Sequence, residues 1–152
     1  MNADQRRSTR IDDDGQVELL HSDITERIIG AFYSVYNQLG CGFLERVYEN
    51  ALAVELSEMG LRVVCQMPLT VWFKGHIVGE YVADIVVENA VLVELKACEA
   101  LTVEHEAQLV NYLKATSFEV GLLLNFGRKP EVRRRVYSNR RKGSQSWLSA
   151  GQ

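Results

Sequence analysis

Apolar residues recur at helical spacing in three segments of the chain. Asp23, with Glu26 three residues later, predicts a helix start, because an acidic cap accepts an orphan amide while the glutamate reaches back. The apolar positions that follow on one face are Ile24, Ile28, Ala31, Phe32, Val35 and Leu39. We expect a second helix from about residue 44 to 59 and a third over residues 103–114.

Between the second and third helices the sequence changes to β-branched and aromatic residues, which favour strands. One strand is expected over residues 63–73. Residues 81–87 and 91–97 are separated by only three residues, which predicts a hairpin, and both stretches are apolar on both faces, as in central strands. Residues 120–126 indicate a further buried strand, and Arg133–Tyr137 is a candidate for a short edge strand.

The expected order of elements is α, α, β, β, β, α, β, an α/β pattern. A chain of 152 residues suits a single compact domain. We expect a flexible N-terminal segment over residues 1–20, one domain over residues 21–138, and a basic, flexible C-terminal tail over residues 139–152.

Charge is distributed unevenly along the chain. Residues 1–127 hold nine basic and 19 acidic side chains, whereas residues 128–152 hold eight basic and one acidic. The net charge of −3 argues against tight binding of nucleic acid by the chain as a whole. The basic segment is suited to phosphate contacts, and the alternative is that it is a solvated terminus.

Cysteine usage and the lengths of apolar runs bear on location. Cys41, Cys65 and Cys98 are odd in number and form no CxxC pair, so neither a disulfide framework nor a zinc site is indicated. The first 15 residues lack an apolar secretion signal, and no apolar run is long enough to span a bilayer. We therefore expect a soluble, cytoplasmic protein that does not enter a membrane.

The predicted hairpin brings charged side chains together. Strand alternation places Glu94 and Lys96 on one face. If the chain turns through residues 88–90, Asp84 lies directly opposite Glu94. Two carboxylates and one ammonium then share a patch in an otherwise apolar row.

Desolvating these charges costs several kcal/mol unless something compensates. One lysine cannot balance two buried acids, so a divalent ion is indicated, and Asp84 and Glu94 offer the oxygen ligands that Mg²⁺ or Mn²⁺ prefers. The backbone carbonyl of Leu95 is a further candidate ligand, and Lys96 would help to activate water and offset phosphate charge. In the alternative, Lys96 neutralises one acid and the other reaches solvent.

Two motifs carry a resemblance to a known family. Asp84 and Glu94-Leu95-Lys96 resemble the D…ExK signature of the PD-(D/E)xK nuclease superfamily, and residues 42–48, GFLERVY, resemble the GxxExxY signature of a branch of it. The resemblance covers roughly residues 20–127. It implies a restriction-endonuclease-like core, in which helices flank a mixed central sheet, with the acidic site at the edge of the sheet.

The resemblance also assigns roles to three further positions and to Glu45. A first-helix glutamate often completes the metal site in the superfamily, and Glu45 is the candidate here, with Tyr48 on the same helix face. The alternative for Glu45 is a first-turn acid favoured by the helix dipole. Gln108 and Tyr112 resemble a Q-x-x-x-Y element that lies near the bound strand, and the alternative for them is packing against the sheet.

The leading hypothesis is an Mg²⁺-dependent or Mn²⁺-dependent nuclease that hydrolyses phosphodiester bonds of DNA or RNA. Asp84 and Glu94 are the expected ligands, Lys96 the catalytic cation and Glu45 the supporting acid. A rival hypothesis is a catalytically silent nucleic-acid-binding or regulatory module on the same fold. A third is a small-molecule phosphohydrolase, which suits the acidic character of residues 1–127.

Overall fold

The computed structural model describes residues 20–143. Its elements are three helices, five strands and one 3-10 helix. They are α3 (Ser22–Leu39), α4 (Glu45–Glu58), β1 (Val63–Phe73), β2 (His76–Val87), β3 (Val91–Lys96), α5 (Val103–Lys114), β4 (Val120–Phe126), β5 (Pro130–Val136) and η1 (Asn139–Lys142). None of the described helices is both long and apolar enough to cross a bilayer.

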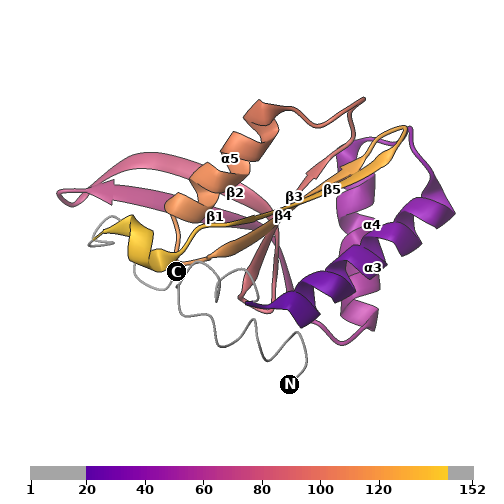
Figure 1. The fold of residues 1–152 in the computed structure, drawn as a ribbon, viewed down its shortest axis with the longest axis horizontal. Helices are drawn as coiled ribbons and strands as arrows, with labels where there is room; N and C mark the ends of the chain where they lie inside the picture. Colours follow the sequence, from indigo (N-terminus) through magenta and orange to yellow (C-terminus); the bar gives the residue numbers. More distant parts are fainter. Residues whose placement is uncertain (1–19, 144–152) are drawn as a thin grey trace, which may run out of the picture.

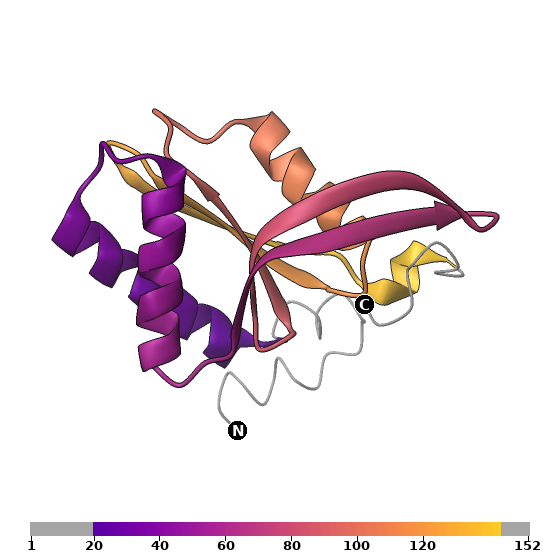
Figure 2. The same cartoon turned by 180° about the vertical axis from the view of Figure 1, so that it is seen from behind.

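The strands form one sheet in the order β1-β2-β3-β4-β5. Neighbouring strands are antiparallel except β3 and β4, which are parallel because α5 connects them as a crossover. Helices α3 and α4 cover one face of the sheet and α5 covers the other (Figures 1 and 2). The expected α/β fold, a mixed sheet flanked by helices, is confirmed, and the candidate edge strand at Arg133–Tyr137 is present as β5.

Each face of the sheet has its own hydrophobic core. Phe32, Tyr48 and Phe126 lie in the core under α3 and α4, whereas Leu109 and Leu123 lie in the core under α5. Strands β3 and β4 face both cores, and all residues of β4 are buried. This explains why their sequences are apolar on both faces, as expected for covered strands.

Strand β2 begins five residues before the expected start at residue 81, because its pairing with β1 continues to Phe73 and His76. The two residues between them, Lys74 and Gly75, both have positive φ, as a tight hairpin turn requires. The outer halves of β1 and β2, residues 69–73 and 76–81, project beyond the helices (Figure 2). We call these residues the hairpin arm.

The described chain remains folded beyond residue 138, where a flexible tail was expected to begin. Residues 139–142 form η1, and Lys142 within it is only 4% exposed. Its Nζ donates to the carbonyl oxygens of Thr116 and Phe118, both at 2.8 Å. These bonds attach η1 to the loop that follows α5. The rest of the expected tail, and nearly all of the expected N-terminal segment, lie outside the described residues.

A close approach between two loops fixes the chain just after β3. The buried Asn125 side chain accepts from the Cys98 amide and donates to the Cys98 carbonyl oxygen, both at 3.0 Å, and also donates to Glu131. Gly127 passes so near that a Cβ there would lie 1.9 Å from the Cys98 carbonyl oxygen. Only glycine fits at this position.

Replacing Gly127 with alanine should therefore lower the free energy of unfolding by about 2 kcal/mol or more, because backbone must move to admit the methyl group. The matched control is Gly30→Ala in α3, where a Cβ meets nothing within 4 Å. That variant should gain about 0.5–1 kcal/mol from helix propensity. Urea unfolding of both proteins measures the difference, and equal stabilities would contradict the close-approach account.

Candidate active site

The hairpin of β2 and β3 has the expected register. Val87 pairs with Val91, Val86 with Leu92 and Ile85 with Val93. The next position along the hairpin places Asp84 opposite Glu94. The predicted convergence of these two acids is therefore confirmed.

At this position side chains replace the backbone pairing of the strands. The Glu94 Oε1 atom accepts the Asp84 amide at 3.0 Å, and the Asp84 Oδ2 atom accepts the Leu95 amide at 2.8 Å. Each carboxylate is thus oriented through one oxygen by the opposite strand. The second oxygen of each is left for a shared proton or a cation.

Burial and mutual repulsion perturb this pair. Glu94 is 4% exposed, and desolvation, followed by the negative charge of Asp84, raises its pKa to about 8. A hydrogen bond to Asp84, which Glu94 donates only when protonated, acts in the same direction. The Asp84 amide and the Lys96 ammonium oppose the shift but do not cancel it.

Lys96 lies at the end of β3, two residues after Glu94, and is half-buried. Within residues 20–143 it forms no ion pair with either acid at 4 Å or less. It lies near enough to lower the Glu94 pKa. The alternative in which Lys96 neutralises one acid directly is therefore not the arrangement seen.

Helix α5 supplies two polar side chains beside the acids. The Gln108 Nε2 atom donates to the Tyr112 hydroxyl at 3.1 Å, so the two share a face as expected. Burial, then the charges of Glu94 and Asp84, raise the pKa of the Tyr112 phenol. Tyr112 therefore lies within electrostatic reach of the carboxylate pair. Contact of Gln108 and Tyr112 with a substrate remains a prediction.

The GxxExxY stretch has mainly a structural role in the described chain. Tyr48 is fully buried, stacks on Phe126 with ring centroids 4.3 Å apart, and donates to the Gly40 carbonyl at 2.6 Å. Its hydroxyl also accepts the Phe43 amide, which closes the turn before α4. Glu45, by contrast, is an exposed first-turn residue of α4. Its expected role in the metal site stays a prediction, and Tyr48 is placed in the core rather than at a substrate surface.

Glu49, one turn after Glu45, is the buried acid of α4, at 4% exposure. It accepts a 2.6 Å hydrogen bond from Gln66, which lies between the register pairs that flank Asp84 on β2. The charges of Glu49 and Asp84 both raise the pKa of Cys65, after burial, which is the largest cause. Glu49 therefore lies on the side of α4 that faces the acid pair.

Glu49 was not among the site residues predicted from the sequence. Its spacing from Leu52 and Leu56, three and seven residues, places it in the apolar stripe of α4, and an acid in such a stripe is a signal that was available. No comparable pattern in the sequence indicates that Gln66 contacts this acid. Its left-handed φ of 56° is set by the local course of β1.

The donors present fit a hard divalent cation, because carboxylate oxygens are the ligands that Mg²⁺ and Mn²⁺ prefer. Among the residues described, no group of three or more His, Cys, Asp and Glu side chains is arranged to hold an ion by itself. Asp84 and Glu94 would therefore need additional oxygens, such as the expected Leu95 carbonyl or water. The close approach of two carboxyl groups, one of them 4% exposed, is the observation that favours a cation.

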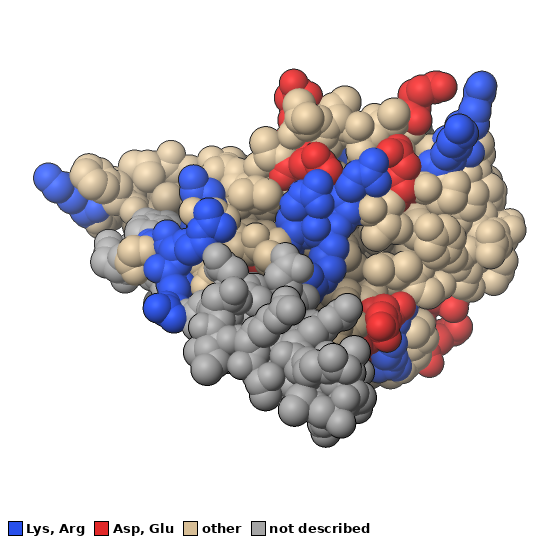
Figure 3. Space-filling model, viewed as in Figure 1, with Lys and Arg blue, Asp and Glu red and all other residues tan. Residues whose placement is uncertain are grey.

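Much of the basic segment is engaged within the protein. Arg133 pairs with Glu131 at 3.2 Å and with Glu106 at 3.4 Å, and Arg135 pairs with Glu106 as well. Basic and acidic side chains accordingly alternate over β5, whereas blue side chains gather without red ones near η1 (Figure 3). Phosphate contact is therefore expected near η1 rather than along the whole basic segment. His105 is a capping residue of α5, whose Nδ1 accepts the Thr102 amide.

In buffer without divalent cations, the raised Glu94 pKa predicts a free energy of unfolding that falls as pH rises. Between the ordinary value of 4.5 and about 8, the folded protein holds a proton that the unfolded chain has released. The slope approaches about 1.4 kcal/mol per pH unit at most. Urea unfolding across this range should show a smaller slope for Glu94→Gln, and identical slopes would assign the effect to other groups.

The chain is similar to one known protein family and to one solved structure. A family model described as the PD-(D/E)XK nuclease superfamily matches residues 22–136. A solved structure titled "Crystal structure of SSO0001" is 18% identical, with a TM-score of 0.49; the match covers 81% of this chain and 62% of that one. No curated protein matches the chain. The family match spans most of the chain and includes both acids, so the chain belongs to the PD-(D/E)XK nuclease superfamily.

Proposed function

We propose that this protein hydrolyses phosphodiester bonds in nucleic acid with the help of Mg²⁺ or Mn²⁺. The observation that carries the proposal is the pairing of the half-buried Asp84 with the buried Glu94, each oriented by an amide of the opposite strand, with Lys96 near them. Superfamily membership supports it. We also assign the chain to the GxxExxY branch, in which Gly42, at a φ of 114°, and Tyr48 build the turn before α4.

The roles of the residues follow from their positions. Asp84 and Glu94, with the Leu95 carbonyl, would hold the cation, which supplies a water of lowered pKa and neutralises charge on the phosphate. Lys96 stands on the same strand face as Glu94 and adds positive charge toward a scissile phosphate. Tyr112, held by Gln108, offers a hydroxyl beside the acids for orienting the substrate.

For the supporting acid of α4, the contacts favour Glu49 over Glu45. Glu49 is buried and bonded to Gln66, opposite Asp84, whereas Glu45 is exposed at the start of the helix. Arg46 pairs with Glu49 at 3.6 Å from the solvent side. Glu49 would act as a positioning residue, through Gln66 and water.

A cleavage assay tests the proposed reaction. With Mg²⁺ or Mn²⁺, the protein should cut single- or double-stranded DNA or RNA, and Asp84→Asn and Lys96→Ala should each reduce the rate by about 10²-fold or more. EDTA should abolish cleavage. A contaminating nuclease would be revealed by activity that persists in Lys96→Ala.

The rival function, a catalytically silent binding module, predicts a different result in the cleavage assay. If the unaltered protein binds nucleic acid but no substrate in the panel is cut with either metal, the enzyme proposal fails and the binding module stands. Thermal unfolding of each variant checks that lost cleavage does not reflect lost folding.

The two helix acids can be compared as a matched pair. Glu49→Gln should lower the metal-dependent cleavage rate by about tenfold or more and raise the metal concentration needed for half-maximal activity, as loss of an outer partner of a metal site does. Glu45→Gln, which removes the same charge one turn earlier, should change both quantities less than twofold. The reverse ranking would restore Glu45 as the supporting acid.

A further inference from the structure

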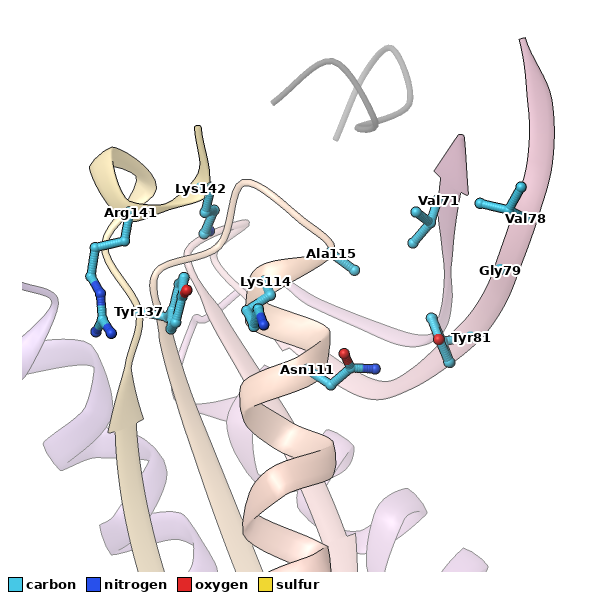
Figure 4. A pocket seen from close by; sticks show the side chains of 10 residues that line it. All are labelled: Val71, Val78, Gly79, Tyr81, Asn111, Lys114, Ala115, Tyr137, Arg141 and Lys142. Carbon is cyan, nitrogen blue, oxygen red and sulfur yellow. The ribbon is translucent and has the colours of Figure 1, made fainter. Parts of the chain in front are cut away.

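A cavity of about 470 Å³ lies between the hairpin arm and the C-terminal half of α5. Figure 4 shows Val71, Val78 and Tyr81 on the arm side, and Asn111 and Lys114 projecting from α5. The last turn of the described chain closes the cavity on the remaining side. Its volume falls within the range of roughly 300–1,000 Å³ usual for small-ligand sites.

The walls of the cavity differ in chemistry. Val71, Val78 and Gly79 make the arm side apolar. On the other side two cations flank one aromatic ring: the Arg141 Cζ atom lies 4.5 Å and the Lys114 Nζ atom 5.9 Å from the centroid of Tyr137. None of the described residues that line the cavity is acidic, although residues 1–127 carry ten more acidic than basic side chains. This arrangement suits a ligand with one apolar, flat part and one anionic part.

The cationic wall is built into the fold. Lys142, which lines the cavity, donates its ammonium protons to Thr116, Phe118 and Asn139, so η1 is tied to the loop after α5. The adjacent Arg141 is exposed, and its guanidinium lies against Tyr137. Because η1 is anchored in this way, the position of Arg141 in the cavity wall is fixed by the fold.

Aromatic contact connects the cavity with the acid pair. Tyr81 lines the cavity, and its ring centroid lies 5.3 Å from that of Tyr112, which lies within electrostatic reach of Asp84 and Glu94. Along α5, the residues at the acids and those at the cavity are about one turn apart. Ala115 lies seven positions after Gln108, a rise of about 10 Å at helical spacing. If a polymer is bound at the acids, its neighbouring units would therefore reach the cavity.

We propose that this cavity binds one nucleotide of single-stranded nucleic acid, adjacent to the bond cut at Asp84 and Glu94. The nucleobase lies against Val71, Val78 and Tyr81, and the phosphates on either side of it contact Lys114 and Arg141, which lie on opposite sides of the Tyr137 ring (Figure 4). Asn111, with an amide donor and acceptor, is placed to contact the edge of the base. This inference rests on the proposed nuclease function, because it takes the polymer at the acid pair to be nucleic acid.

A single strand fits this arrangement better than a duplex. Aromatic and apolar surfaces bind bases that are unstacked, and cations beside them follow the backbone. In a duplex both faces of each base are covered by stacking and the inner edge by pairing, so insertion between the arm and α5 would first require the base to leave the helix. The cavity therefore selects strands with accessible bases.

Binding measurements without cleavage test the inference. In EDTA, fluorescence anisotropy should show that the full-length protein binds a labelled DNA or RNA single strand at least about tenfold more tightly than the same sequence in a blunt duplex. Arg141→Ala should weaken single-strand binding by about tenfold and reduce the salt dependence by about one phosphate contact. The control is Arg128→Ala, an exposed arginine in the turn between β4 and β5, which should change binding less than twofold.

A second variant acts on the apolar wall without removing charge. A Cβ at Gly79 would lie 3.4 Å from the Tyr81 ring and 3.6 Å from the Val71 Cβ, so alanine is accommodated while the cavity narrows. Gly79→Ala should weaken single-strand binding severalfold with no change in salt dependence.

Equal affinity for single strand and duplex, or equal effects of Arg141→Ala and Arg128→Ala, would overturn the inference. Because no cleavage is measured, these failures are distinct from failure of the nuclease proposal. Absence of metal-dependent cleavage in a protein that binds as expected would refute only the nuclease proposal. Comparison of DNA with RNA of one sequence shows which sugar the cavity accepts.

Discussion

Asp84 and Glu94 meet where the backbone pairing of β2 and β3 gives way to side-chain contacts, and each carboxylate accepts an amide from the opposite strand. This mutual orientation brings two carboxyl groups together, and one of them, that of Glu94, belongs to a residue only 4% exposed. Burial raises the pKa of Glu94, and repulsion from Asp84 raises it further. A proton on Glu94 relieves this repulsion in the protein alone, and a divalent cation would relieve it more fully.

The surrounding fold maintains that contact. Covering layers on both faces of the sheet exclude water from β3 and β4, and the Asn125 contacts with Cys98 hold the chain just beyond Lys96. Helix α5 places Tyr112 within electrostatic reach of the acids on one face of the sheet. On the face covered by α4, Glu49 is hydrogen-bonded to Gln66 of β1. The polar groups of the site thus come from five elements, α4, β1, β2, β3 and α5, of which α4 and α5 are far apart in sequence.

Local patterns in the sequence were sufficient to predict the elements that position the acids. Strand alternation and a three-residue turn predict the pairing of Asp84 with Glu94, because both are properties of the hairpin alone. The buried position of Glu49, its hydrogen bond with Gln66 and the ion pair of Arg133 with Glu106 depend on contacts between distant segments. Charge counting along the chain could not show that arginines of β5 face acids of α5 and β5.

The central claim, that the acid pair is a cation site, is tested most directly by isothermal titration calorimetry with Mn²⁺ or Mg²⁺ at about pH 7, below the Glu94 pKa of about 8, in two buffers of different ionisation enthalpy. We expect saturable binding with release of about one proton per ion, because the cation displaces the proton held by Glu94. Asp84→Asn should lose most of the binding. Absence of binding to the unaltered protein at millimolar metal would contradict the claim, as would binding that Asp84→Asn leaves unchanged.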